Sequence, residues 1–435
     1  MAQTNQVLIH ARAEPSEAPL RAQVRRDAQR VSGSAFQLSV TSDLSVLERE
    51  WRKFEQYADC TAFQSFDWLQ TWQRCIGARR GMVPAIVVGR QAGGDLAFIF
   101  PLAVEQGRLA RRLTFLGREL GDYNAPLLAP GFSSAVSADA FPTLWEEIRD
   151  LLRTEERFRH DVVLLDKLPE RVGSQRNPFI ALHVAPNPSG AYLTALAGDW
   201  DTFYAAKRSS STRRRDRSKR KRLSESGDIQ MVTPVVPQDS LGTLDVLIEQ
   251  KRRAFARMGV PDIFARPGYP EFYTDLVSRA PSLIHVSRLQ IGSAYAATNF
   301  ALVFRGRYYH VLASYDEGPL LRFGPGAAHL HELMRYAIER GCDSFDFTIG
   351  DEPYKRDWCD TELKLYDHVA AVTPRGWVVA APVALARLAK RAIKQSPLLW
   401  RLVTRLRAAG GAARPAGTAD AADRDADAGS GRKAA

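Results

Sequence analysis

Two kinds of apolar pattern alternate along this chain, and their order occurs twice. Between residues 36 and 188, stretches with helical spacing are followed by the apolar runs MVPAIVVGR and LAFIFPLAV around a glycine turn, which predict a hairpin. An amphipathic helix and the short apolar strand VVLLD complete this block. Between residues 189 and 375, helices predicted over 199–227, 241–258 and 269–278 precede three strand candidates, a further helix and the strand SFDFTI. The repeated order predicts an α/β (α+β) fold of two units, each with a mixed, mainly antiparallel sheet flanked by helices.

The two ends of the chain lack the apolar residues that a folded unit needs. Residues 1–35 are polar and charged, and residues 408–435 are rich in Ala, Gly and Asp. Such segments cannot bury enough apolar surface to offset the entropy lost on ordering, so we expect both to be disordered. No apolar run is long enough to cross a membrane and no signal sequence is visible, which favours a cytoplasmic protein.

The net charge of +11 is concentrated in one segment. Residues 207–222, KRSSSTRRRDRSKRKR, hold ten basic side chains and one acidic one, so the remainder of the chain is close to neutral. Such a run attracts phosphates, tRNA or an anionic membrane, and it is equally compatible with a solvated helix face. It contains no aromatic residues for stacking on bases, so sequence-specific nucleic-acid binding is not expected.

The four cysteines form no CxxC pair and have no zinc-type spacing with histidine. We interpret them as small, mostly buried apolar side chains. The chain also lacks the motifs of serine hydrolases, zinc proteases and EF-hands. A bound metal is therefore not expected.

A glycine-rich turn precedes one of the predicted helices. In LRFGPGAAHLHELM, Gly324 and Gly326 stand between the strand candidates and the helix N-terminus. Glycine lets the backbone approach a ligand closely, and the free amides of a helix N-terminus suit a phosphate. The segment is neither a P-loop nor a complete GxGxxG fingerprint, and a simple Gly-Pro turn is the alternative interpretation.

The densest polar cluster follows the strand SFDFTI. It includes Asp346, Asp351, Tyr354 and Lys355. Loops that follow sheet strands often carry site residues on a rigid scaffold. These side chains therefore form either a candidate catalytic cluster or a surface loop whose charges pair with one another.

Three segments carry a resemblance to a known family: FQSFDWLQTWQ, FLGRELGDYNAPLLAP and FDFTIGDEPYKRDWC. Together they resemble the CelD/BcsL-type acetyltransferases, which belong to the GNAT superfamily, are related to FemAB-like peptidyltransferases and are associated with cellulose and exopolysaccharide biosynthesis. The resemblance implies tandem GNAT-like domains at residues 36–188 and 189–375. Residues 376–407 then form a basic helical segment outside both domains.

The resemblance also implies a donor site and a catalytic site. Acetyl-CoA would be the acyl donor, with its pyrophosphate held by backbone amides of the glycine turn. The residues implied to bind it are Arg322, Gly324, Gly326 and Ala327. Pro325 stands where the family pattern has its first glycine. In FemAB-like relatives a lysine in a similar aromatic-Lys context contacts substrate phosphate or carbonyl, and Lys355 after Tyr354 resembles it.

Acyl transfer requires a general base for the attacking amine or hydroxyl and a donor or cation for the developing oxyanion. Asp346 and Asp351 are the candidate bases, and Lys355 is the candidate cation. We expect an acetyl-CoA-dependent transferase that acts on a small-molecule or sugar- or lipid-linked acceptor in polysaccharide or cell-envelope biosynthesis. Two alternatives stay open. One is a FemAB-like aminoacyl-tRNA-dependent peptidyltransferase, in which the basic run engages tRNA. The other is a catalytically silent scaffold, which is favoured by the proline at position 325 in place of the family's glycine.

The stretch 382–407 combines basic residues with leucines and contains no acidic residue. This composition suits an interfacial helix on anionic lipid. A helix packed on the protein's own surface is the alternative. A location at the inner face of the membrane would suit the modification of lipid-linked sugars, and we state it as a hypothesis.

Overall fold

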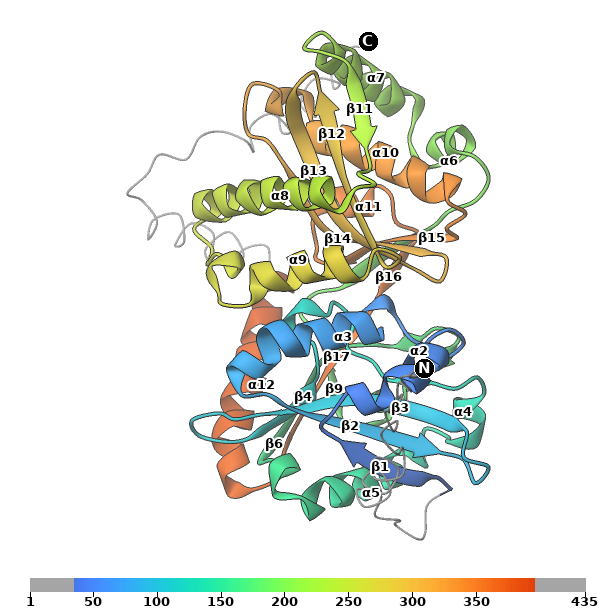
Figure 1. Ribbon diagram of the computed structural model, residues 1–435, viewed down its shortest axis with the longest axis vertical. Helices are drawn as coiled ribbons and strands as arrows, with labels where there is room; N and C mark the ends of the chain where they lie inside the picture. Colours follow the sequence, from blue (N-terminus) through green and yellow to red (C-terminus); the bar gives the residue numbers. More distant parts are fainter. Residues whose placement is uncertain (1–34, 396–435) are drawn as a thin grey trace, which may run out of the picture.

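The computed structural model describes residues 35–395, which form two α/β units placed end to end (Figure 1). The predicted leader, apart from residue 35, and the predicted tail lie outside the described residues. The part of the predicted basic segment beyond residue 395 lies outside them as well. Within residues 35–395, no helix is long and apolar enough to cross a membrane.

The first unit is built on a mixed sheet whose main path is β1-β2-β3-β4-β6-β17-β9. Along that path only β4 and β6 pair in parallel. The strands are β1 (Gln37–Thr41), β2 (Val83–Arg90), β3 (Leu96–Glu105), β4 (Arg112–Phe115), β6 (Val162–Pro169), β17 (Leu365–Ala371) and β9 (Val184–Pro186). The predicted hairpin is the β2–β3 pair. Every residue of β3 is buried, because apolar clusters cover both of its faces.

Helices cover both faces of this first sheet. Helices α2 (Glu48–Phe54) and α3 (Phe66–Trp72) pack on one face, and α5 (Phe141–Thr154) packs on the other. One of the stretches with helical spacing in the first block begins as a 3-10 turn at Ser45–Leu47 and continues as α2. Helix α3 has an apolar face, and its two tryptophans are fully buried.

The second unit has its own mixed sheet, in the order β11-β12-β13-β14-β15-β10-β16. Its strands are β11 (Ile229–Val232), β12 (Ile284–Ile291), β13 (Ala294–Phe304), β14 (Arg307–Tyr315), β15 (Ser344–Ile349), β10 (Ala191–Ala195) and β16 (Thr361–Leu363). The three successive strand candidates of the sequence are β12, β13 and β14, which form an antiparallel meander. Strand β15 then pairs with β14 in parallel, because α10 (Pro325–Glu339) returns the chain to the starting edge.

Two layers of helices enclose the second sheet. In Figure 1, α8 (Pro237–Met258) and α9 (Tyr269–Arg279) lie in front of it, and α10 lies behind. Helices α6 (Trp200–Lys207) and α7 (Ser210–Ser224) pack beside α10. The single helix predicted over 199–227 is therefore two helices, because Ser209 adopts an extended conformation and caps α7 by accepting from the Thr212 amide.

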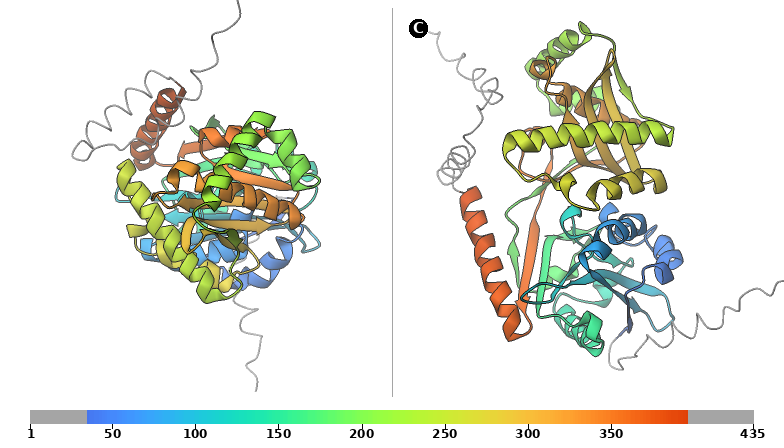
Figure 2. Two further views of the ribbon diagram at one scale, coloured as in Figure 1. Left: turned by 90° about the horizontal axis from the view of Figure 1, so that it is seen from above. Right: turned by 60° about the vertical axis from the view of Figure 1, so that its left-hand side comes forward.

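The chain returns to the first unit after completing the second. Strand β17 pairs with β6 and with β9 of the first sheet, although we expected residues 189–375 to form one unit. Helix α12 (Pro374–Gln395) follows and packs against β17 and β6 (Figure 2). The sequence does not predict β17, because its buried positions do not alternate regularly and so show no two-residue period.

The two units share one apolar core. The ring of Phe63 in the first unit lies 5.7 Å from that of Tyr309 in the second, and Trp68 lies 4.9 Å from Phe272. The largest buried cluster contains residues of both units. The expected fold class, mixed α/β with mixed sheets flanked by helices, is confirmed.

Candidate active site

The site is organised by the point at which β14 and β15 separate. The two strands pair in parallel over three residues each, Arg307–Tyr309 with Ser344–Asp346, and then continue without pairing. A bulge in β14 marks the separation, because His310 pairs with Ala301 while Leu312 pairs with the preceding residue of β13. Since the carboxyl ends of parallel strands meet at one edge, the glycine turn after β14 and the polar cluster after β15 both start from that edge.

The glycine turn has the backbone geometry that the predicted donor site needs. Gly324 is left-handed, with φ of 68°, and is the N-cap of α10 without any side-chain cap. Pro325 occupies the first helical position, where its missing N–H costs nothing. The amides of the first turn therefore have no side-chain acceptor, which suits an anion. A Cβ at Gly326 would lie 2.9 Å from Cδ1 of Tyr315, so this position accepts no side chain without a shift.

A cavity of about 490 Å³ lies beside this turn, between α7 and α10. Gly324 and Ala327 line it, while Arg322 lies over the ring of Phe323, with its guanidinium carbon 4.7 Å from the ring centroid. Basic side chains of α7 and α10 also line it: Arg213, Arg217, Lys219, Arg220 and Arg335. The stacked rings of Trp200 and Tyr204, 5.0 Å apart, form part of the wall. The lining offers cations for phosphates and aromatic faces for a planar ring.

Asp346 lies at the contact between the two units. Its carboxylate is fully buried, accepts a hydrogen bond of 2.7 Å from the Tyr123 hydroxyl and accepts another from the Thr348 amide. The Arg307 guanidinium lies 3.5 Å from its other oxygen. Burial raises the pKa of Asp346 above its usual range, although Arg307 and Tyr123 oppose this. These contacts are those of a carboxylate that positions its neighbours, since a base must reach the proton it removes.

The other three predicted residues follow β15. Asp351 accepts hydrogen bonds from the Tyr192 hydroxyl and the Gly190 amide. Lys355 is buried at 4% exposure, and its ammonium donates to the carbonyl of Ile349 at 3.0 Å and to Glu352 at 2.8 Å.

Tyr354 is more exposed than its neighbour Lys355, at 41%, and its ring lies 6.2 Å from that of Phe347. The structure thus places Lys355 against the end of β15. Tyr354 lies nearer the surface.

The structure adds two residues to this cluster that the sequence analysis did not select. Asp122, in the loop after β4, lies close to the side chain of Thr348, which favours its charged form. Burial raises the pKa of Asp122 to about 6, against the opposing ammonium groups of Lys167 and Lys355. His310, at the bulge, is buried, and burial together with the Lys355 charge lowers its pKa to about 3, so its ring is neutral near pH 7.

The loop that carries Asp122 is held by Lys167 of β6. The Lys167 ammonium donates to the carbonyl oxygens of Arg118, Glu119 and Gly121, the last at 2.6 Å. Lys167 itself has a positive φ of 53°. A charged group that satisfies three carbonyls fixes the position of the loop directly before Asp122.

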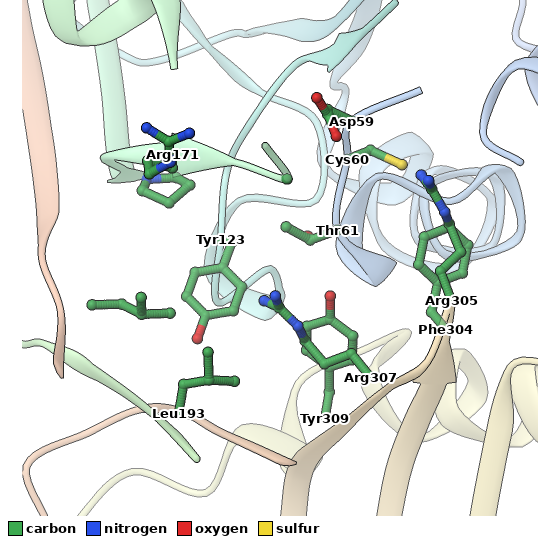
Figure 3. Close-up of a pocket in the computed structure, with 13 residues that line it drawn as sticks. Asp59, Cys60, Thr61, Tyr123, Arg171, Leu193, Phe304, Arg305, Arg307 and Tyr309 are labelled. Atoms are coloured by element: carbon green, nitrogen blue, oxygen red, sulfur yellow. The ribbon is translucent and has the colours of Figure 1, made fainter. Parts of the chain in front are cut away.

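A second cavity, of about 280 Å³, opens at the junction of the two units (Figure 3). Three arginines, Arg171, Arg305 and Arg307, line it, and Figure 3 shows the Arg307 guanidinium between the rings of Tyr123 and Tyr309. Tyr123 and Arg307 also contact Asp346, so this junction cavity adjoins the polar cluster. Its guanidinium groups match the geometry of phosphate or carboxylate.

Cysteine and metal chemistry find little support at this junction. Cys60 lines the cavity, but burial raises the pKa of its thiol to about 12, which keeps it protonated. All four cysteines are free. Among residues 35–395, no group of three or more His, Cys, Asp or Glu side chains is placed to hold a metal ion.

Comparison with known proteins defines the class of this domain. Residues 210–356, which include α7, the glycine turn and the cluster up to Lys355, match the acetyltransferase (GNAT) domain family. The chain therefore contains a GNAT-type acetyltransferase domain, which confirms the GNAT part of the resemblance. No curated protein matches the chain.

The whole fold is similar to that of FemX. The crystal structure of FemX superposes with a TM-score of 0.53 at 10% identity, over 74% of this chain and 96% of that one. A conserved protein of unknown function from Bacteroides thetaiotaomicron VPI-5482 (TM-score 0.47, 11% identity, 75% and 98% coverage) and L-PGS from Bacillus licheniformis (0.42, 12%, 72% and 90%) also match. The protein thus has a FemX-like fold with a GNAT domain in its second unit.

Proposed function

We propose that this protein is an acyl-CoA-dependent acyltransferase, with acetyl-CoA as the first candidate donor. The observation that carries the proposal is the position of the match to the acetyltransferase (GNAT) family. It covers the separating strands β14 and β15, the uncapped N-terminus of α10 and most of the residues that line the cavity beside it. The donor's phosphates would accept from the amides of the α10 first turn, with the arginines of α7 nearby.

The acceptor would occupy the junction cavity. Its three arginines favour a molecule with a phosphate or carboxylate group, such as a sugar carried on a phosphate or a lipid-linked sugar. The resemblance to CelD/BcsL-type proteins supports a role in exopolysaccharide or cell-envelope biosynthesis, and we include that role in the proposal.

The chemistry assigns a separate task to each group in the cluster. The acceptor's amine or hydroxyl attacks the thioester carbonyl, and its proton passes to the Asp122 carboxylate. The carbon–sulfur bond then breaks to release the thiolate of CoA, which takes up the proton from Asp122 and restores the carboxylate. Asp122 is a better base than Asp346 because its pKa of about 6 is close to the working pH and because Asp346 is fully buried. Lys355 supplies positive charge for the developing oxyanion.

The donor site is tested by calorimetry with acetyl-CoA. Ala327 is exposed and lines the cavity, and a carboxylate at this position is favoured by the helix N-terminus, so Ala327→Glu should fold normally. The variant should nevertheless weaken acetyl-CoA binding by roughly tenfold or more, because it competes with the phosphates. Ala327→Gln, the matched control, should retain binding. Absence of binding by the wild type would overturn acetyl-CoA as the donor, and longer acyl-CoAs would be tested in the same way.

A second candidate function is aminoacyl transfer from tRNA. The FemX-like fold favours it, and α7 presents the exposed basic residues Arg214, Arg215, Lys221 and Arg222. Phosphate contacts of this kind give binding that falls steeply with salt. Filter binding of aminoacyl-tRNA across a salt series tests this candidate, and Arg214→Gln with Arg215→Gln should reduce the slope by about one to two. Absence of binding by every acyl-CoA tested and by aminoacyl-tRNA would favour the silent scaffold.

A further inference from the structure

Helix α12 is attached to the first unit by one of its faces. Val379, Ala380 and Val383 pack on an apolar cluster that includes Val162 and Leu164 of β6. Arg387 of α12 lies 3.5 Å from Asp367 of β17. The sequence was compatible with a helix on the protein's own surface or with a helix on the membrane. The packed face shows that α12 has a defined position on the first unit.

The opposite face of α12 is apolar and exposed. Trp377 is 67% exposed, Val378 59%, Leu385 69% and Leu388 59%. Positions 377, 381, 385 and 388 follow helical spacing, so these side chains form one stripe along the helix. Ala381 and Pro382 are also exposed. Figure 2 shows α12 on the outside of the first unit.

Such a stripe requires a partner, because soluble proteins rarely expose several large apolar side chains in a row. The positive charge of residues 374–407 indicates which kind of partner fits the stripe. Residues 374–407 contain eight Lys and Arg residues and no Asp or Glu. A symmetric contact between two copies would place two cationic helices against each other, which is unfavourable. Residues 408–435 contain no Leu, Ile, Val, Met or aromatic residue that could cover the stripe.

We propose that the exposed stripe of α12 docks on an anionic lipid bilayer. Trp377, Leu385 and Leu388 enter the boundary between headgroups and acyl chains, and the net positive charge of the segment attracts it to anionic headgroups. The helix lies in the plane of the surface, since no described helix is apolar enough to cross the membrane. This proposal stands independently of the acyl-transfer proposal, because it rests on α12 alone.

The test is flotation of the full-length protein with vesicles of phosphatidylcholine and phosphatidylglycerol, compared with vesicles of phosphatidylcholine alone. The protein should float with the anionic vesicles and much less with the neutral ones. The double variant Trp377→Ser with Leu385→Ser should lower the bound fraction by roughly tenfold or more. A matched control, Val235→Ser with Val260→Ser, removes two exposed apolar side chains of the second unit and should leave flotation unchanged.

Three outcomes would overturn the proposal. The first is no flotation of the wild type, and the second is equal flotation of the stripe variant. The third is a wild-type dimer in light scattering that the stripe variant dissociates, without flotation, which would assign the stripe to a second copy. Unchanged circular dichroism of both double variants shows that they are folded. Acetyl-CoA calorimetry on the same stripe variant separates this result from the donor-site proposal, since the variant should bind acetyl-CoA as the wild type does.

Discussion

Tyr123 of the first unit donates a hydrogen bond of 2.7 Å to the buried carboxylate of Asp346 in the second unit. The two residues are separated by 223 positions in the chain, and Asp346 is the last residue of β15 that pairs with β14. The bond therefore fixes the first unit against the point at which the two strands separate. It also places the loop of Asp122 beside Thr348.

Removal of this hydroxyl should destabilise the junction of the two units. In Tyr123→Phe the buried Asp346 loses the donor from the first unit and keeps only the Thr348 amide, while the volume and packing of the ring are unchanged. We expect a loss of about 1–3 kcal/mol in the free energy of unfolding, measured by urea denaturation. Tyr57→Phe removes a hydroxyl from a tyrosine that is 47% exposed and should change the value little. Equal effects of the two variants would contradict the role given to Tyr123.

Lys167 should control the order of the loop that carries Asp122. Lys167→Met keeps a long apolar stem but leaves the carbonyls of Arg118, Glu119 and Gly121 without the ammonium. We expect faster amide hydrogen exchange in residues 117–124 and lower transferase activity. Lys53→Met, at an exposed position of α2, is the control and should change neither. Unchanged exchange in Lys167→Met would show that the loop is held by other contacts.

The pH dependence of the reaction should report Asp122. Its folded pKa is about 6, above the ordinary value of 3.8, so activity that needs the carboxylate should rise with pH through about 6. Asp122→Asn should lower the rate constant by about 10²–10⁴ and remove this inflection. The exposed Asp95→Asn is the control. An unchanged pH profile in Asp122→Asn would assign the base to another group.

The raised pKa of Asp122 also predicts how the free energy of unfolding depends on pH. A carboxyl whose folded pKa is raised binds its proton more tightly in the folded state, so its contribution favours the folded state at low pH. That contribution is lost as pH rises from 3.8 through about 6. As the pH rises across this range, the unfolding free energy of the wild type should therefore fall relative to that of Asp122→Asn. A difference that is independent of pH would contradict the raised pKa.

Gly376 should be required for the docking of α12. A Cβ at this position would lie 1.9 Å from the carbonyl oxygen of Asp161, which is backbone and cannot move aside cheaply. Gly376→Ala should therefore cost about 1–3 kcal/mol in thermal or chemical unfolding, as overpacking does in other cores. Gly93→Ala meets no atom within 4 Å and should be nearly neutral.

Periodicity predicted most of the individual elements because their burial is local and regular. The β2–β3 hairpin, the meander of β12 to β14 and helix α10 all have apolar positions that match one period. The break between α6 and α7 was missed, since Ser209 interrupts a basic run whose helical spacing has no apolar face to mark it. Strand β17 and its pairing with β6 were both missed, because its buried positions show no regular two-residue period and because a strand's sequence does not name its partner.

The candidate site was predicted in part. The residues after β15 and the glycine turn stand close to one another in the chain's second unit, so their polarity and glycine content were visible in the sequence. Asp122 and the junction arginines come from separate loops and strands. The motif FLGRELGDYNAPLLAP contains Asp122 and Tyr123 and supported the family resemblance, but nothing in the sequence joined it to Asp346.

By itself, the sequence determined the two α/β units, the concentration of charge in residues 207–222 and the glycine turn before α10, because these properties depend on composition and short spacing. Only the tertiary structure decided that Asp346 is buried against Tyr123, that Asp122 lies beside Thr348 and that α12 exposes one apolar face. The reason is physical: desolvation and contacts between distant residues exist only once the two units are packed together, and they set both the pKa of a carboxyl and the surface that remains for a partner.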